Sequence, residues 1–85
     1  MSTAHIENEI RTYLVDTFLM GKSEALPADG SLLGSVIDST GLLELVTHLQ
    51  EYYGIIVEDD DVVPENLGSV ELVAAYVTGK LDSKK

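Results

Sequence analysis

The residues best placed to do chemistry are Asp38, Ser39 and Thr40, which lie together where a turn-rich segment gives way to a helical pattern. Each can accept a hydrogen bond from the free N–H groups in the first turn of a helix, so the tripeptide predicts a helix start. An anion on the Ser39 oxygen, such as a phosphodiester, would lie over these N–H groups and the positive end of the helix dipole. The simpler interpretation is that Asp38 or Ser39 only caps the helix, and the dipeptide alone does not exclude it.

The segment after this start predicts a helix over residues 39–53 with two different faces, closed by Gly54. Its apolar stripe, which we expect to be buried, consists of Leu42, Leu45, Val46, Leu49, Tyr52 and Tyr53. At about 100° per residue, the opposite side carries Thr40, Leu43, Glu44, Thr47 and Glu51. An exposed Leu43 beside acidic residues suits a docking surface, because the acids steer a basic partner and the apolar contact holds it.

Two segments precede this helix. Apolar residues recur at helical spacing over residues 3–20, and Gly21 is placed to end that helix. Residues 21–38 predict a long loop, rich in turn residues, whose length is typical of a functional connection. The loop should be pinned to the core by Leu26, Leu32, Leu33, Val36 and Ile37.

Two further helices are expected after it. A short one should occupy about residues 59–64, where acidic residues favour a helix start and Pro64 limits the length. The last should run over about residues 69–79, with Ser69 as its N-cap and Gly79 near its end. The chain is therefore expected to be all-α, with three main helices and a short third one.

The charge of the chain is large and unevenly placed. The formal net charge is −10, and between residues 23 and 79 there are eleven acidic residues with no Lys or Arg. Such a surface steers basic partners, although it can also serve only to keep the chain in solution. It argues against nucleic acid as a partner, because that affinity depends on Lys and Arg displacing counterions.

Size and composition limit the possibilities further. Eighty-five residues with 45% apolar content predict a single domain over residues 1–85. There is no Cys for a disulfide, and two His residues are too few for a zinc site. No apolar run approaches the roughly 18 residues needed to cross a bilayer, and the first residues lack a signal pattern. We expect a cytoplasmic monomer without a metal site.

A longer motif around Ser39 resembles a known family. The phosphopantetheine attachment motif of the acyl carrier protein family is similar to the run Gly34-Ser35-Val36-Ile37-Asp38-Ser39-Thr40-Gly41-Leu42-Leu43-Glu44-Leu45. The aromatic-Gly-Ile that ends the second helix in that family resembles Tyr52-Tyr53-Gly54-Ile55, and the start of its last helix resembles Asn66-Leu67-Gly68-Ser69-Val70. The similarity covers about residues 32–77 and implies a small antiparallel four-helix bundle.

The resemblance also implies a function, that of a non-catalytic acyl or aminoacyl carrier. Ser39 would bear 4′-phosphopantetheine, attached covalently from coenzyme A, and Asp38 would help a phosphopantetheinyl transferase and its magnesium ion to engage the serine. The arm would hold a thioester-linked cargo, supplied by an adenylating acyl or aminoacyl ligase and used by an acyl transferase or synthase. The partner docking residues would be Thr40, Leu43, Glu44, Thr47 and Glu51.

The chain departs from the family pattern directly after the serine. That position is usually Leu or Met, whereas here Thr40 is followed by Gly41, which weakens the apolar contact made there by typical members. The form Asp-Ser-Thr-Gly is more similar to aminoacyl and D-alanyl carriers than to the carriers of fatty acid synthesis.

Three alternatives to a carrier function differ in how well the sequence supports them. In an enzyme with Ser39 as nucleophile and His48 as base, nine helical residues would leave the imidazole on the far side of the helix, so we expect no catalysis and a solvent-edge His48. Residues 58–61 lack the alternate ligand spacing of a calcium loop and read as a solvated helix start. The remaining rival is an acidic adaptor that binds a basic protein surface and is never modified.

Overall fold

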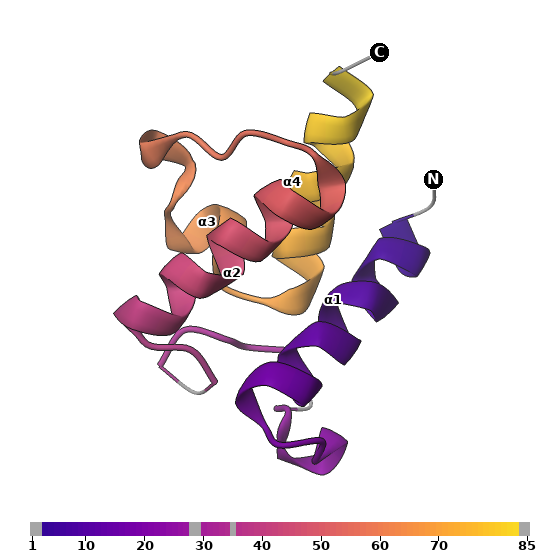
Figure 1. Cartoon of the computed structure of the whole chain (residues 1–85), viewed down its shortest axis with the longest axis vertical. Coiled ribbons are helices and arrows are strands. Elements are labelled where there is room, and N and C mark those ends of the chain that lie inside the picture. Colours follow the sequence, from indigo (N-terminus) through magenta and orange to yellow (C-terminus); the bar gives the residue numbers. More distant parts are fainter. Residues whose placement is uncertain (1–2, 28–29, 35, 84–85) are drawn as a thin grey trace.

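The structure, a computed structural model, describes residues 3–27, 30–34 and 36–83, and of Ser39 it describes only the backbone. The regular elements in these ranges are α1 (Thr3–Phe18), η1 (Ser23–Ala25), α2 (Ser39–Tyr53), η2 (Asp59–Asp61), α3 (Pro64–Leu67) and α4 (Val70–Ser83). In Figure 1, α1 runs in the opposite direction to α2 and α4. The predicted all-α class is confirmed, and the described residues form a small helical bundle.

The core lies where the apolar faces of the helices meet. α4 packs most extensively against α1 and α3, and it also contacts α2. The buried apolar cluster contains Ile6, Ile10, Leu14, Leu32, Ile37, Leu45, Leu49, Ile55, Val57, Leu67, Val70, Val73, Ala74 and Val77. Most of these residues recur three or four positions apart within one helix, as expected for amphipathic helices around a single core.

The loops are tied to this core. Leu32 and Ile37 of the long loop are buried, as their apolar character predicted. The loop is joined to the start of α4, because the Leu32 N–H donates to the Gly68 carbonyl at 2.9 Å and the Val70 N–H donates to the Gly30 carbonyl at 3.0 Å. These bonds fix the loop that leads into α2.

The ends of the first two helices follow glycine positions. α1 ends at Phe18, two residues earlier than predicted, because Met20 already has a φ of 55° and Gly21 has a φ of 80°. The Gly21 N–H donates to the Val15 carbonyl at 2.9 Å, which closes the helix end. α2 occupies the predicted range, and Gly54 ends it in the left-handed conformation, with a φ of 68°.

The predicted third helix is wrong in position. Residues 59–64 were expected to form one short helix ended by Pro64, but η2 covers only Asp59–Asp61 and α3 begins at Pro64. Proline has no N–H, and the first residue of a helix needs none, so the ring fits at the start of a helix at no cost in hydrogen bonding. Pro64 therefore begins a helix where we expected it to end one.

The last helix is longer than predicted. Ser69 caps it as expected, since its Oγ accepts a hydrogen bond from the Leu72 N–H at 3.1 Å. The helix does not end near Gly79 but continues to Ser83. The additional turn is held by Leu81, which packs against the core, and by Lys80, which pairs with Asp61 at 3.3 Å. These tertiary contacts outweigh the low helix propensity of one glycine.

Gly79→Ala is expected to stabilise the chain. Gly79 lies inside α4 and is exposed, and a Cβ built on it would meet no atom within 4 Å. Alanine loses less backbone entropy in a helix, so the free energy of unfolding should rise by about 0.5–1 kcal/mol. Urea unfolding of the wild type and the variant measures the difference, and a destabilised variant would contradict the described course of α4.

Asp61 joins the segment before α3 to α4. Its Oδ2 accepts a hydrogen bond from the Tyr76 hydroxyl at 2.8 Å and lies 3.3 Å from the Lys80 Nζ. The hydrogen bond from Tyr76, with the charge of Lys80, lowers the pKa of Asp61 below its ordinary value. The ionised form is therefore favoured by the folded state.

This depressed pKa predicts a pH dependence. A carboxyl group that is more acidic in the folded state stabilises the fold above its unfolded pKa, about 4, and this contribution is lost as the pH falls below that value. Asp61→Asn should lower the melting temperature at neutral pH, and the difference from wild type should shrink in acid. Thermal melts at neutral pH and near pH 3 measure this, and a constant difference would contradict the linkage.

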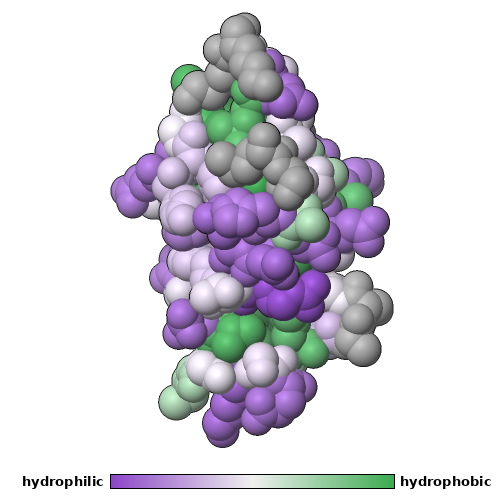
Figure 2. Space-filling model, turned by 90° about the vertical axis from the view of Figure 1, so that its right-hand side faces the viewer, coloured by the Kyte–Doolittle hydropathy of each residue, from purple (hydrophilic) through white to green (hydrophobic). Residues whose placement is uncertain are grey.

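One face of the molecule shows how polar and apolar residues are distributed over its surface. Figure 2 shows the α1 side of the molecule, where hydrophilic residues cover the middle and the lower tip, and hydrophobic residues are visible above and below the middle. Within the described ranges, no helix combines the length and the apolar character required to cross a membrane.

Candidate functional site

The start of α2 is built by Asp38. This residue has an extended backbone, and its Oδ1 accepts a hydrogen bond from the Gly41 N–H at 2.9 Å. Of the three residues that could have capped the helix, Asp38 is therefore the N-cap and Ser39 is the first helical residue. The backbone of Ser39 is placed at the N-terminal tip of α2, while its side chain lies outside what the structure describes, so the exposure of the hydroxyl stays a prediction.

A tight loop sets the position of this tip. The N–H groups of Val36 and Ile37 both donate to the Leu32 carbonyl, at 2.8 and 2.9 Å, and the Gly34 N–H donates to the Ile37 carbonyl at 3.1 Å. Because Leu32 and Ile37 are also buried, the chain enters Asp38 from a fixed point on the core.

Gly41 allows α1 to approach the first turn of α2 closely. A Cβ at this position would lie 2.9 Å from Ile37 Cγ2 and 3.0 Å from Phe18 Cε1, closer than carbon atoms normally pack. Gly41 itself is buried. This contact explains why position 41 is a glycine, since Phe18 and Ile37 fill the space that a side chain would need.

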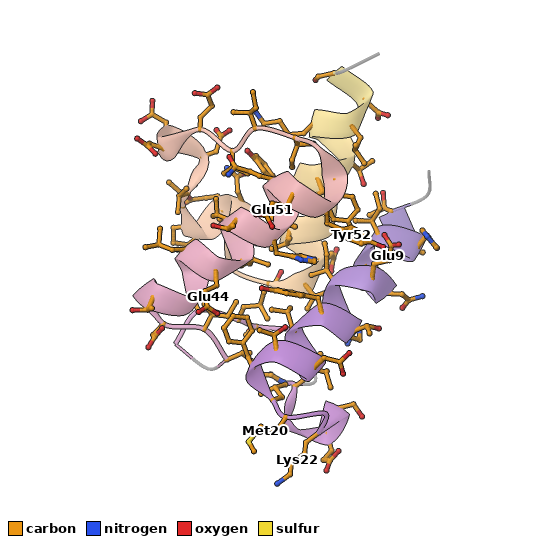
Figure 3. All side chains as sticks on the ribbon, in the orientation of Figure 1. Glu9, Met20, Lys22, Glu44, Glu51 and Tyr52 are labelled. Carbon is orange, nitrogen blue, oxygen red and sulfur yellow. The ribbon has the colours of Figure 1, made fainter. Side chains whose placement is uncertain are left out.

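The five residues assigned to docking lie on one side of α2 and are all exposed. They are Thr40, Leu43, Glu44, Thr47 and Glu51. Leu43 has 64% of its surface exposed although it is apolar. Together with Tyr13 and His48, the five residues line one open groove, which we call the α1–α2 groove. In Figure 3, Glu44 lies nearer the start of α2 and Glu51 nearer its end.

Tyr13 and His48 form a contact between α1 and α2 that the sequence did not reveal. Their rings are stacked, with centroids 3.6 Å apart and an interplanar angle of 6°. His48 is half-buried and lines the groove, which agrees with a position at the solvent edge, but α1 covers one face of its imidazole. Burial lowers the pKa of His48, and the charge of Glu51 partly opposes that shift.

Glu9 of α1 accepts hydrogen bonds from two tyrosines of α2. Its Oε2 accepts a hydrogen bond from the Tyr52 hydroxyl at 3.0 Å, and its Oε1 accepts one from the Tyr53 hydroxyl at 2.9 Å. Tyr52 was expected on the buried stripe but has 54% of its surface exposed, since its hydroxyl turns to Glu9 at the edge of the core (Figure 3). Burial and the bond to Glu9 raise the pKa of Tyr53 well above its ordinary value.

A second hollow lies between α1 and α2, next to the α1–α2 groove. It is lined by His5, Asn8, Glu9, Thr12, Tyr13, His48 and Tyr52. Tyr13 and His48 belong to both hollows, so their ring stack stands between them. His5 also contacts Glu9, with 3.4 Å between His5 Nε2 and Glu9 Oε2.

Neither a family model nor a curated protein matches this chain. Among the described residues, no group of three or more His, Cys, Asp or Glu side chains is placed to hold a metal ion. Of the acidic run 58–61, Asp61 is engaged with Tyr76 and Lys80 and serves the fold.

The geometry opposes a serine–histidine pair. Ser39 and His48 both lie on α2, nine residues apart, which is about 13.5 Å along the helix axis. His48 is in addition stacked on Tyr13. A general base must come within hydrogen-bonding distance of the hydroxyl that it activates, and His48 is too far along the helix to do so.

Proposed function

We propose that this chain is an acyl or aminoacyl carrier protein of the cytoplasm, in which Ser39 bears a 4′-phosphopantetheine arm that holds a thioester-linked cargo. The chain is not itself an enzyme in this proposal. A phosphopantetheinyl transferase attaches the arm, an adenylating acyl or aminoacyl ligase loads it, and an acyl transferase or synthase receives the cargo. The family resemblance of residues 34–45 suggested the proposal, and the local structure at Ser39 supports it.

The observation that carries the proposal is the position of Ser39 relative to the cap of α2. Asp38 supplies the capping bond to the Gly41 N–H, so the helix start does not depend on the serine oxygen. A phosphodiester on the first residue of a fifteen-residue helix would lie near the positive end of the dipole and the unpaired N–H groups, where a negative charge is favoured. Modification at this position is compatible with an intact helix.

The chemistry at the serine is a substitution at phosphorus. The Ser39 oxygen forms a bond to the phosphorus that carries the pantetheine arm of coenzyme A, and the phosphoanhydride bond breaks. The nucleotide bisphosphate leaves, and the hydroxyl proton passes to a base of the transferase. Asp38 lies beside the reacting serine, and in the proposal its carboxylate engages the magnesium ion of the transferase.

The exposed face of α2 supports the part of the proposal in which partner proteins dock on the chain. Four exposed residues, two of them carboxylates, surround the exposed apolar Leu43, and the groove that the five residues line contains no Lys or Arg. An apolar centre with an acidic rim favours a basic partner surface, since charge raises the association rate and desolvation of the apolar contact adds affinity.

The test is a modification assay on the purified chain. Incubation with coenzyme A, magnesium and a phosphopantetheinyl transferase should increase the intact mass by one phosphopantetheine group. Peptide mapping should place the group on Ser39 and not on Ser69, the other serine at the start of a long helix. If several transferases leave the mass unchanged, the acidic face would instead be assigned to an unmodified adaptor that binds a basic protein.

A further inference from the structure

The α1–α2 groove begins beside the attachment residue. Thr40, which follows Ser39 in the chain, is one of its lining residues, and the groove extends along α2 as far as Glu51. Its volume is about 520 Å³. Tyr13 is the residue that α1 contributes to the lining, and its ring lies flat on that of His48.

The lining of this groove favours a cation. Two carboxylates, Glu44 and Glu51, stand on one side of it, one turn before and one turn after the stacked rings. The faces of aromatic rings also attract cations, and a carboxylate nearby strengthens that attraction. No lining residue is a Lys or Arg that would compete for the carboxylates. A carboxylate ligand would be repelled here, and a plain alkyl chain would gain little in so open a groove.

The arm is long enough to bring its cargo to the ring stack. About fourteen bonds separate the serine oxygen from the sulfur of phosphopantetheine, nearly as many as in five residues of extended backbone, which span about 16 Å. His48 lies about 13.5 Å from Ser39 along the helix axis. Because His48 faces away from Ser39 on the helix, the arm has to cross the width of the helix as well as this length. The far end of the carried group, several bonds beyond the sulfur, is therefore the part that reaches the space between Glu44, Glu51 and the rings.

From these observations, and resting on the proposed function, we infer that the α1–α2 groove binds the carried group while it waits on the arm, and that this group bears a protonated amine, as an aminoacyl thioester does. The ammonium group lies between the carboxylates of Glu44 and Glu51, against the side of the Tyr13–His48 ring stack that lines the groove. The groove thereby selects its cargo by charge.

The test compares three cargoes on the same chain. A transferase attaches arms that end in a β-alanyl, a butyryl or a succinyl group, each joined by an amide in place of the thioester so that it does not hydrolyse. The β-alanyl and butyryl groups have the same shape and differ in charge. Backbone amide shifts of Tyr13, Thr47 and His48, measured by NMR against the unmodified chain, report occupation of the groove.

We expect the β-alanyl arm to shift these amides about twofold or more beyond the butyryl arm, and the succinyl arm to shift them least. The double variant Glu44→Gln with Glu51→Gln should reduce the excess shift of the β-alanyl form by more than half. Glu65→Gln, which removes an exposed carboxylate on α3 outside the groove, is the matched control and should leave it unchanged.

Two results overturn the inference. Equal shifts from the β-alanyl and butyryl arms would show that the groove does not recognise the ammonium group, and an equal loss in the Glu65→Gln control would show a general charge effect. Either result leaves the carrier function standing, because the arm will have been attached. A chain that accepts no arm from any transferase overturns the carrier function and this inference together.

Discussion

Ser39→Ala is expected to abolish the addition of phosphopantetheine completely while leaving the free energy of unfolding within about 0.5 kcal/mol of the wild type. The modification needs a hydroxyl at this position, and alanine has none. The fold should tolerate the change, because Asp38 and not Ser39 accepts the capping hydrogen bond of α2. Position 39 is already helical, and alanine has the highest helix propensity of all residues. Intact mass after the transferase reaction and urea unfolding measure the two halves of the prediction.

Variants of Asp38 provide the matched control. Asparagine also caps helices well, so Asp38→Asn should keep the stability but slow the addition of the arm, since it removes the charge proposed to engage magnesium. Asp38→Ala removes the cap as well and should cost about 0.5–2 kcal/mol of stability. If the Asp38→Asn variant is modified as fast as the wild type, Asp38 serves only as the helix cap. If the Ser39→Ala variant is unfolded, the serine side chain itself stabilises the start of α2.

The start and end of α2 could be predicted because each is encoded locally. A capping residue, an apolar repeat and a glycine in the left-handed conformation define the helix within seventeen consecutive residues, from Asp38 to Gly54. The spacing of residues also predicted which face of α2 is exposed, since residues three and four apart lie on one side of a helix. Most of the candidate site on α2 is therefore readable from spacing alone.

The errors occur where a local signal has two meanings or is outweighed by packing. Proline both begins and ends helices, and the choice at Pro64 depends on the turn before it. Glycine often ends a helix, but Gly79 lies within α4 because Leu81 and Lys80 find partners beyond it. Neither choice can be made from the neighbouring residues only.

The contribution of α1 to the site was missed for a related reason. Tyr13 falls within the apolar repeat of residues 3–20, and His48 was expected at the solvent edge of α2. Each position is compatible with its own helix. Their stacking depends on how the two helices are set against each other. The spacing of residues in one helix does not contain that information, so the groove and its aromatic wall needed the structure.

Gly41→Ala is expected to destabilise the chain, although the same change at Gly79 should stabilise it. Alanine gains about 1 kcal/mol over glycine inside a helix. At Gly41, however, the new Cβ would lie 2.9 Å from Ile37 Cγ2 and 3.0 Å from Phe18 Cε1, and overpacking of this kind costs about 1–3 kcal/mol. We expect a net loss of up to about 2 kcal/mol, and each kcal/mol lowers the melting temperature of a domain of this size by roughly 4–8 °C.

The consequence for function follows from the place of the clash. Phe18 ends α1, and Ile37 precedes the cap of α2, so relief of the overlap has to move the segment that presents Ser39. Gly41→Ala should therefore slow the addition of the arm as well as lower the melting temperature, whereas Gly79→Ala should change only the stability. Restoring the space with Phe18→Leu in the Gly41→Ala background should recover part of the lost rate. If Gly41→Ala is modified at the wild-type rate and melts higher, the close approach of α1 to the first turn of α2 does not exist in solution.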